Sequence, residues 1–203
     1  GLHPNEAPRI FEKEGRAGLD AAYASIRSMA DEDVVRAVGE TGLDYFRSAE
    51  ELHPIQQESF RRHIAIAKEV GKTLVIHDRE SHQDVMDILL EEGAPERVIF
   101  HCFSGDAAMA KFCTDQGWYL SFAGVVTFKN ATDLHEAATV VPDELILVET
   151  DAPYLTPVPN RGKPNASYLM PFTVRALASL RGVSEEVMAE HLWTNAQRVF
   201  GQW

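Results

Sequence analysis

Cysteines are scarce in this sequence and form no recognisable pattern. The 203 residues include only Cys102 and Cys113, whose spacing matches neither a disulfide framework nor a Cys-x-x-Cys metal site. Disulfides are rare in the reducing cytosol, where unpaired thiols persist. We therefore expect a cytoplasmic protein in which both thiols pack against neighbouring side chains.

Long apolar runs and low-complexity stretches are also missing. No segment reaches the roughly 20 apolar residues that a membrane-spanning helix needs. With 45% hydrophobic residues, the chain can still bury a large core. We expect one domain over residues 1–203 with no membrane contact, and the sequence shows no sign of a protein partner.

Basic residues are in the minority. The 19 Lys and Arg residues face 31 Asp and Glu residues, so the net charge is −12. This excess argues against a protein that grips nucleic acid through a broad basic surface. It leaves open an enzyme that meets phosphate groups through a metal ion and a few local cations.

Short apolar runs alternate with segments of helical periodicity along the whole chain. The runs predict strands at 34–38, 73–76, 97–100, 119–122 and 145–148. The periodic segments predict helices at 18–30, 54–70, from 82, 107–116 and 133–139. Two or three more helices are predicted at the end of the chain, over 171–181, 185–191 and 194–200. Residues 1–4 resemble the end of a further strand and its turn. Alternation of this kind predicts an α/β protein with a parallel sheet covered by helices.

Two architectures fit that alternation, an open doubly wound sheet and an incomplete eight-stranded barrel. No strand is followed by a glycine-rich phosphate fingerprint, which weakens the nucleotide-binding open sheet. We favour a TIM-type (β/α)8 barrel whose first strands are missing from this chain.

Four polar residues follow buried strands where the apolar pattern stops, namely Glu40, His77, His101 and Asp151. His3 has the equivalent place near Gly1. Each has an ordinary explanation by itself, such as a core histidine, a turn cap or a surface ion pair. Together they predict one pocket, because parallel strands end at the same face. Five other histidines, at 53, 63, 82, 135 and 191, are expected mostly on the solvated surface.

The predicted ligands indicate the kind of metal. Imidazoles and carboxylates without thiolate suit Zn²⁺, Mn²⁺, Co²⁺ or Mg²⁺. A carboxylate such as Glu40 can bridge two ions, and an aspartate such as Asp151 can take a proton from water. Glu149 is expected to face the same way as Asp151. The loop that follows contains Arg161 and Lys163 and is expected to contact phosphate.

Six motifs together resemble the TatD family of metal-dependent deoxyribonucleases. They are GLHP at 1–4, GETGLD at 39–44, HDR at 77–79, HCFSG at 101–105, ETDAPYL at 149–155 and PNRGKPN at 159–165. The resemblance implies an amidohydrolase-like TIM barrel, one or two divalent ions, and hydrolysis of phosphodiester bonds in DNA, typically from a 3′ end.

The resemblance also implies roles for individual residues. Glu40 would be shared between ions, His77 and His101 would bind one ion, and Asp151 would bind the other and activate water. The residues expected near single-stranded DNA or its 3′ ends are His3, Arg79, Arg161 and Lys163. The family also has a His-x-His pair on its first strand, which would precede Gly1. A metallohydrolase of small esters, lactones or amides, or an inactive fragment, remains an alternative.

Overall fold

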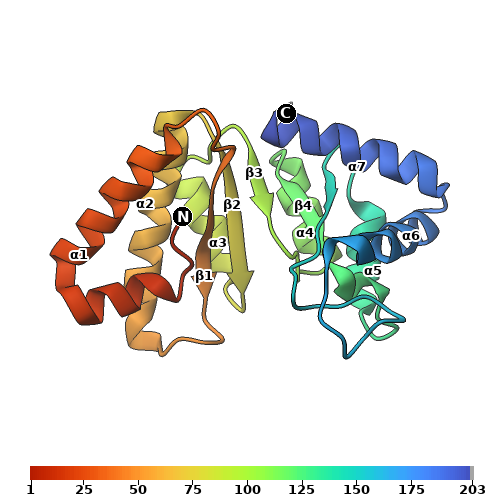
Figure 1. Ribbon diagram of the computed structural model, residues 1–203, viewed down its shortest axis with the longest axis horizontal. Coiled ribbons are helices and arrows are strands. Elements are labelled where there is room, and N and C mark those ends of the chain that lie inside the picture. The colour runs from red at the N-terminus through yellow and green to blue at the C-terminus, as the bar shows by residue number, and fades with distance from the viewer. Residues whose placement is uncertain (202–203) are drawn as a thin grey trace. The chain divides into compact units, whose positions relative to one another are not determined.

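The structure, a computed structural model, describes residues 1–201. Contacts between residues divide the chain into two compact units, Gly1–Ile99 and Phe100–Trp203. Each unit combines parallel strands with helices, as Figure 1 shows. The α/β class predicted from the alternating pattern is confirmed.

The first unit is built around the parallel pair β1 (Ala37–Asp44) and β2 (Thr73–Arg79). Helix α2 (His53–Val70) packs on β1, and α1 (Glu6–Ala30) packs on α2 (Figure 1). Helix α3 (His82–Glu92) follows β2, and β3 (Val98–Phe100) begins at the end of the unit. The largest fully buried side chains of this unit are Leu19, Leu43, Phe60, Ile64, Leu74, Ile76 and Leu89.

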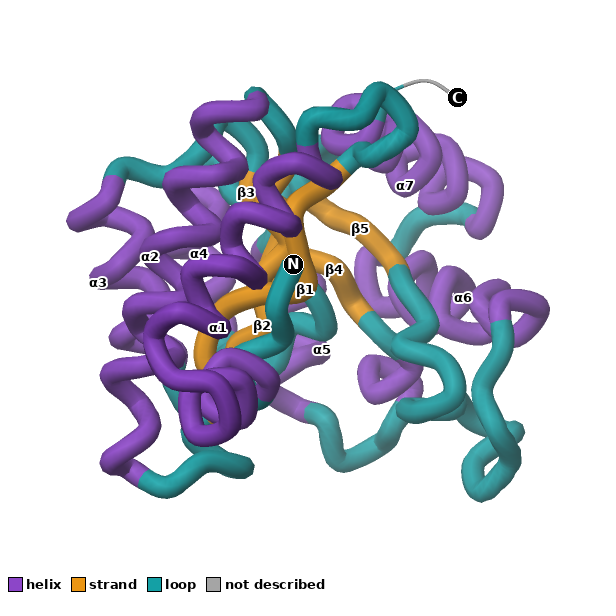
Figure 2. The backbone as a smooth tube through the Cα atoms, turned by 60° about the vertical axis from the view of Figure 1, so that its left-hand side comes forward, coloured by secondary structure: helices purple, strands orange, loops and turns teal. Residues whose placement is uncertain are grey.

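The second unit contains the parallel pair β4 (Tyr119–Phe122) and β5 (Ile146–Val148). Its helices are α4 (Ala107–Asp115), α5 (Thr132–Val140), α6 (Met170–Arg181) and α7 (Glu185–Phe200). Helix α7 packs on β5 and on α6, and α5 packs on α4 and α6. Figure 2 shows the long loop between β5 and α6 that joins strand to helix.

Strand β1 differs most from the sequence-based expectation. The bounds predicted for this strand, 34–38, are wrong: only 37–38 belong to β1, Val34 is 82% exposed, and β1 runs on through the GETGLD motif. Two glycines allow β2 to approach there: a Cβ at Gly39 or Gly42 would lie 2.6 or 2.1 Å from a carbonyl oxygen of β2. The glycines looked like strand breakers in the sequence, but here they permit close pairing.

Helix boundaries also differ at both ends of the chain. Residues 1–3 are not in a strand, and α1 begins twelve residues before the predicted helix, with non-helical angles at Gly15. Of the two or three helices predicted at the C-terminal end, two are present, because 185–191 and 194–200 form one helix, α7. No Gly or Pro interrupts that segment, so nothing stops the helix once the Ser184 side chain has capped it at Val187 N.

No helix of the described part of the chain combines the length and the apolarity that crossing a membrane requires.

Candidate metal centre

Three of the predicted site residues lie together in the first unit. Glu40 Oε1 is 2.7 Å from His77 Nδ1 and 3.6 Å from His3 Nε2. The two imidazole rings meet edge to face, with centroids 4.5 Å apart. Glu40 and His77 come from β1 and β2, and His3 from the segment before α1.

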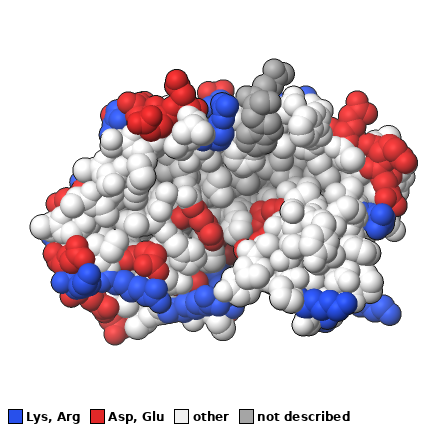
Figure 3. Space-filling model, in the orientation of Figure 1, with Lys and Arg blue, Asp and Glu red and all other residues white. Residues whose placement is uncertain are grey.

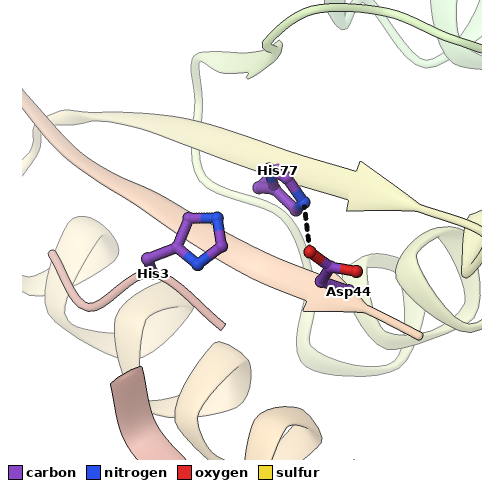
Figure 4. A group of neighbouring side chains, drawn as sticks. All are labelled: His3, Asp44 and His77. Atoms are coloured by element: carbon purple, nitrogen blue, oxygen red, sulfur yellow. Dashed lines mark ion pairs between the residues drawn. The ribbon is translucent and has the colours of Figure 1, made fainter. Parts of the chain in front are cut away.

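Asp44 joins this group, although the sequence did not single it out as a site residue. It ends β1, is 1% exposed, and its Oδ2 lies 3.4 Å from His77 Nε2 (Figure 4). The other imidazole nitrogen of His77 faces Glu40, so this ring sits between two carboxylates. Alternation was the signal for Asp44, because residues two apart on a strand share a face.

The hydrogen bonds of His3 define its neutral tautomer. Its Nδ1 accepts a hydrogen bond from Asn5 N at 3.2 Å, so the neutral ring carries its proton on Nε2, toward Glu40. Burial lowers the pKa of His3, and neighbouring His77 lowers it further, while Glu40 and Asp44 oppose the shift. The neutral ring therefore presents an N–H donor to the site at neutral pH.

Two more candidate residues, His101 and Glu149, lie together in the second unit. His101 follows β3, and its Nδ1 is 2.7 Å from Glu149 Oε1, with each side chain 18% exposed. Histidines that bind metals commonly place one ring nitrogen against a carboxylate, which orients the other nitrogen. Glu149 is placed to orient His101 in this way.

Asp151 lies two residues beyond Glu149, in an unusual backbone conformation. Its φ of 54° is in the left-handed region, which few residues other than glycine adopt. The side chain of Asn165, itself 6% exposed, donates to the carbonyl oxygens of Thr150 and Tyr154 at 2.7 and 2.8 Å. These bonds hold the turn around Asp151, and such outliers often mark functional sites.

The basic loop is also held in place within the second unit. The Arg161 guanidinium lies 4.2 Å from the centre of the Phe128 ring, and Thr156 Oγ1 donates to Lys163 O at 2.6 Å. In the first unit, Arg79 lies on β2, on the same side as His77. The convergence of His101 and Asp151 with Glu40 and His77 in one pocket stays a prediction.

One histidine expected at the surface is fully buried, so that prediction is wrong for His63. Its Nε2 accepts from Leu2 N at 2.9 Å, and its Nδ1 donates to Ser59 O at 2.7 Å. Burial lowers the pKa of His63 to about 4. Both ring nitrogens are used by the backbone, so His63 supports the segment that carries His3.

The chemistry of the donors fits a divalent ion. Glu40 Oε1 and Asp44 Oδ2 lie 2.7 and 3.4 Å from the two ring nitrogens of His77, so carboxylate and imidazole donors are adjacent here. Imidazole and carboxylate without thiolate is the donor set of catalytic zinc and manganese sites.

Comparisons with known proteins agree with this chemistry. A family profile described as "TatD related DNase" matches residues 1–201. The Mycobacterium tuberculosis protein named "uncharacterized metal-dependent hydrolase TatD" is 46% identical over 205 residues, which cover 98% of this chain and 74% of the relative. The Escherichia coli K12 protein named "uncharacterized metal-dependent hydrolase YcfH" is 43% identical over 201 residues, which cover 98% of this chain and 72% of that relative.

Solved structures give the same result for the fold. YjjV, a TatD homologue from Escherichia coli K12, superposes with a TM-score of 0.86 at 25% identity, over 100% of this chain and 76% of that one. A TatD family hydrolase from Entamoeba histolytica superposes with a TM-score of 0.80 at 20% identity, over 98% of this chain and 73% of that one. The predicted TIM-type fold is confirmed by this likeness. The chain belongs to the TatD related DNase family and is a metal-dependent hydrolase that uses a divalent ion.

Proposed function

We propose that this protein is a deoxyribonuclease that hydrolyses phosphodiester bonds in DNA, working from the 3′ end of single strands. The observation that carries the proposal is the family match over residues 1–201, combined with the histidine–carboxylate group at the ends of β1 and β2. Membership of the family makes the protein a metal-dependent hydrolase. The DNA substrate and the direction of cleavage are what the proposal adds.

The proposal assigns the metal ligands from the predicted set. Glu40, His77, His101 and Asp151 hold the divalent ion or ions, with Glu40 shared if there are two. A bound ion lowers the pKa of water and balances charge on the phosphate oxygens. A carboxylate oxygen of Asp151 accepts the proton that the attacking water loses.

Two side chains orient the imidazoles in this scheme. Asp44 faces His77 Nε2, and Glu149 faces His101 Nδ1, each from another part of its own unit. A carboxylate at one ring nitrogen fixes both the tautomer and the direction of the ring. Asp44 and Glu149 are therefore positioning residues for the predicted ligands.

The remaining predicted residues contact the substrate. His3 offers an N–H from Nε2 to a phosphate oxygen, while Arg79, Arg161 and Lys163 offer positive charge. Acidic and basic side chains both occur on the face shown in Figure 3, and the net charge is −12. Local cations rather than a broad basic surface then attract DNA, so binding weakens only modestly with added salt.

The test is digestion of a single-stranded oligonucleotide labelled at its 5′ end, with Mg²⁺, Mn²⁺, Zn²⁺, Co²⁺ or EDTA. We expect a ladder that shortens from the 3′ end with metal and no cleavage with EDTA. The double variant Arg161→Ala with Lys163→Ala should lose far more activity on the oligonucleotide than on a small carboxylic ester.

The matched control is Arg9→Ala with Lys13→Ala, which removes two cations from α1 that are 71% and 80% exposed. This control should cleave the oligonucleotide as the wild type does. An intact, metal-loaded protein that cleaves esters and leaves every oligonucleotide whole would overturn the proposal.

A further inference from the structure

An exposed aromatic ring lies next to the histidine–carboxylate group of the first unit. Phe46 is 55% exposed, although a phenylalanine is usually buried. It follows Asp44 by two residues, which span at most about 7 Å of chain. Phe46 is therefore close along the chain to Asp44, which faces the proposed ligand His77.

A cation covers one face of this ring. The Arg79 guanidinium lies 4.0 Å from the centre of the Phe46 ring. Because more than half of the Phe46 surface remains accessible, the other face of the ring is open to solvent. The guanidinium keeps its positive charge in this contact, so it can also meet an anion such as phosphate.

The backbone beneath Phe46 is held by several hydrogen bonds. Arg47 N donates to Asp44 Oδ1 at 3.0 Å, and Ser48 Oγ donates to Asp44 O at 2.7 Å. Next to Phe46, the Tyr45 ring stacks on His53, with centroids 3.7 Å apart. A ring on a fixed turn loses little freedom when a ligand stacks on it, which favours binding.

Neighbouring hydrogen bonds fix Tyr45 further. Its hydroxyl donates to Asp84 Oδ2 at 2.6 Å and accepts from Gln57 Nε2 at 2.7 Å. Burial, and then the hydrogen bond to Asp84, raise the pKa of Tyr45 to about 12. Tyr45 is thus an internal support, and Phe46 is the member of the pair that faces solvent.

We propose that the open face of Phe46 stacks on a nucleobase of single-stranded DNA while Arg79 holds the neighbouring phosphate. This inference rests on the proposed function and specifies how that site selects its substrate. Stacking on an aromatic side chain accepts any base and needs a base outside a duplex. The pair therefore favours single strands and frayed ends without reading sequence.

The experiment compares oligonucleotides that carry a base or an abasic residue at each of the last three positions. We expect one position at which the wild type cleaves the normal oligonucleotide about tenfold faster, in kcat/KM, than the abasic one. Phe46→Ala should bring this ratio close to one, and Phe46→Trp should keep it. Met29→Ala is the control, since Met29 is 54% exposed at the far end of α1 from this site and should keep the wild-type ratio.

Several outcomes would overturn the stacking proposal. The first is a wild-type kcat/KM that an abasic residue changes at none of the three positions. The others are a Phe46→Ala variant that keeps the wild-type ratio and a Phe46→Trp variant that loses it. Binding measured by fluorescence anisotropy in EDTA repeats the comparison without hydrolysis. A protein that binds with the expected ratio but cleaves nothing would contradict the deoxyribonuclease proposal and support the stack.

Discussion

Lowering the pH should destabilise the protein through one buried histidine, His63. The folded pKa is about 4, and the ordinary value is 6.5. Between these values the unfolded chain binds a proton that the folded protein does not, so stability falls as the pH falls. The contribution of His63 is complete above pH 6.5 and is lost progressively down to pH 4.

The size of the effect follows from the two pKa values. A difference of about 2.5 units predicts a loss of about 2 kcal/mol by pH 5 and about 3 kcal/mol by pH 4. The side chain is fully buried, so solvent does not screen this effect. The added proton would go to Nε2, which then could no longer accept the hydrogen bond from Leu2 N.

The assay is urea unfolding followed by circular dichroism at pH 8, 7, 6, 5 and 4, for the wild type and for His63→Leu. The variant should be less stable at pH 8, because Leu2 N and Ser59 O lose their partner. The difference between the two proteins should then shrink by about 2 kcal/mol between pH 7 and pH 5. Other titrating groups are common to both proteins and largely cancel.

A constant difference across this pH range would refute the reasoning, since it would mean that His63 titrates equally in both states. Nuclear magnetic resonance of the imidazole gives an independent check. The His63 signals should stay those of a neutral ring down to pH 5, and a midpoint near 6.5 would contradict the buried position.

Three substitutions test local contacts of the fold. Gly42→Ala should cost about 3 kcal/mol in thermal unfolding, because φ is 129° and the new Cβ would lie 2.1 Å from a carbonyl oxygen of β2. Gly71→Ala, with φ of 64° and no atom within 4 Å of its Cβ, should cost only about 1 kcal/mol. Asn195→Ala should cost about 3 kcal/mol, since the buried amide donates to Asp143 O and Ile146 O at 2.7 and 2.9 Å. Equal losses at the two glycines, or an unchanged melting temperature without the Asn195 amide, would contradict these contacts.

The sequence predicted the fold class well because hydrophobic periodicity is local. The runs at 73–76, 97–100, 119–122 and 145–148 all overlap strands of the structure. Strand β1 was misplaced because its glycines look like breakers until β2 is known to lie against them. The pairing of β1 with β2 decides whether these glycines end the strand, and a single sequence does not show which strands pair.

The same limit applies to the candidate site residues. Glu40, His77 and His101 interrupt apolar runs, which is visible in the sequence itself. Asp44 looked like part of a turn, and only the register of β1 with β2 puts its carboxylate 3.4 Å from His77 Nε2.

Two predicted histidine ligands each face a carboxylate that lies at or just after the end of a different strand in the same unit. His77 faces Asp44, and His101 faces Glu149, in both cases across a long stretch of sequence. In the proposed function, each of these carboxylates orients its imidazole and does not contact the substrate. Interrupted apolar runs point to candidate ligands in the sequence, whereas only the fold shows which acids, Asp44 and Glu149, lie against two of them.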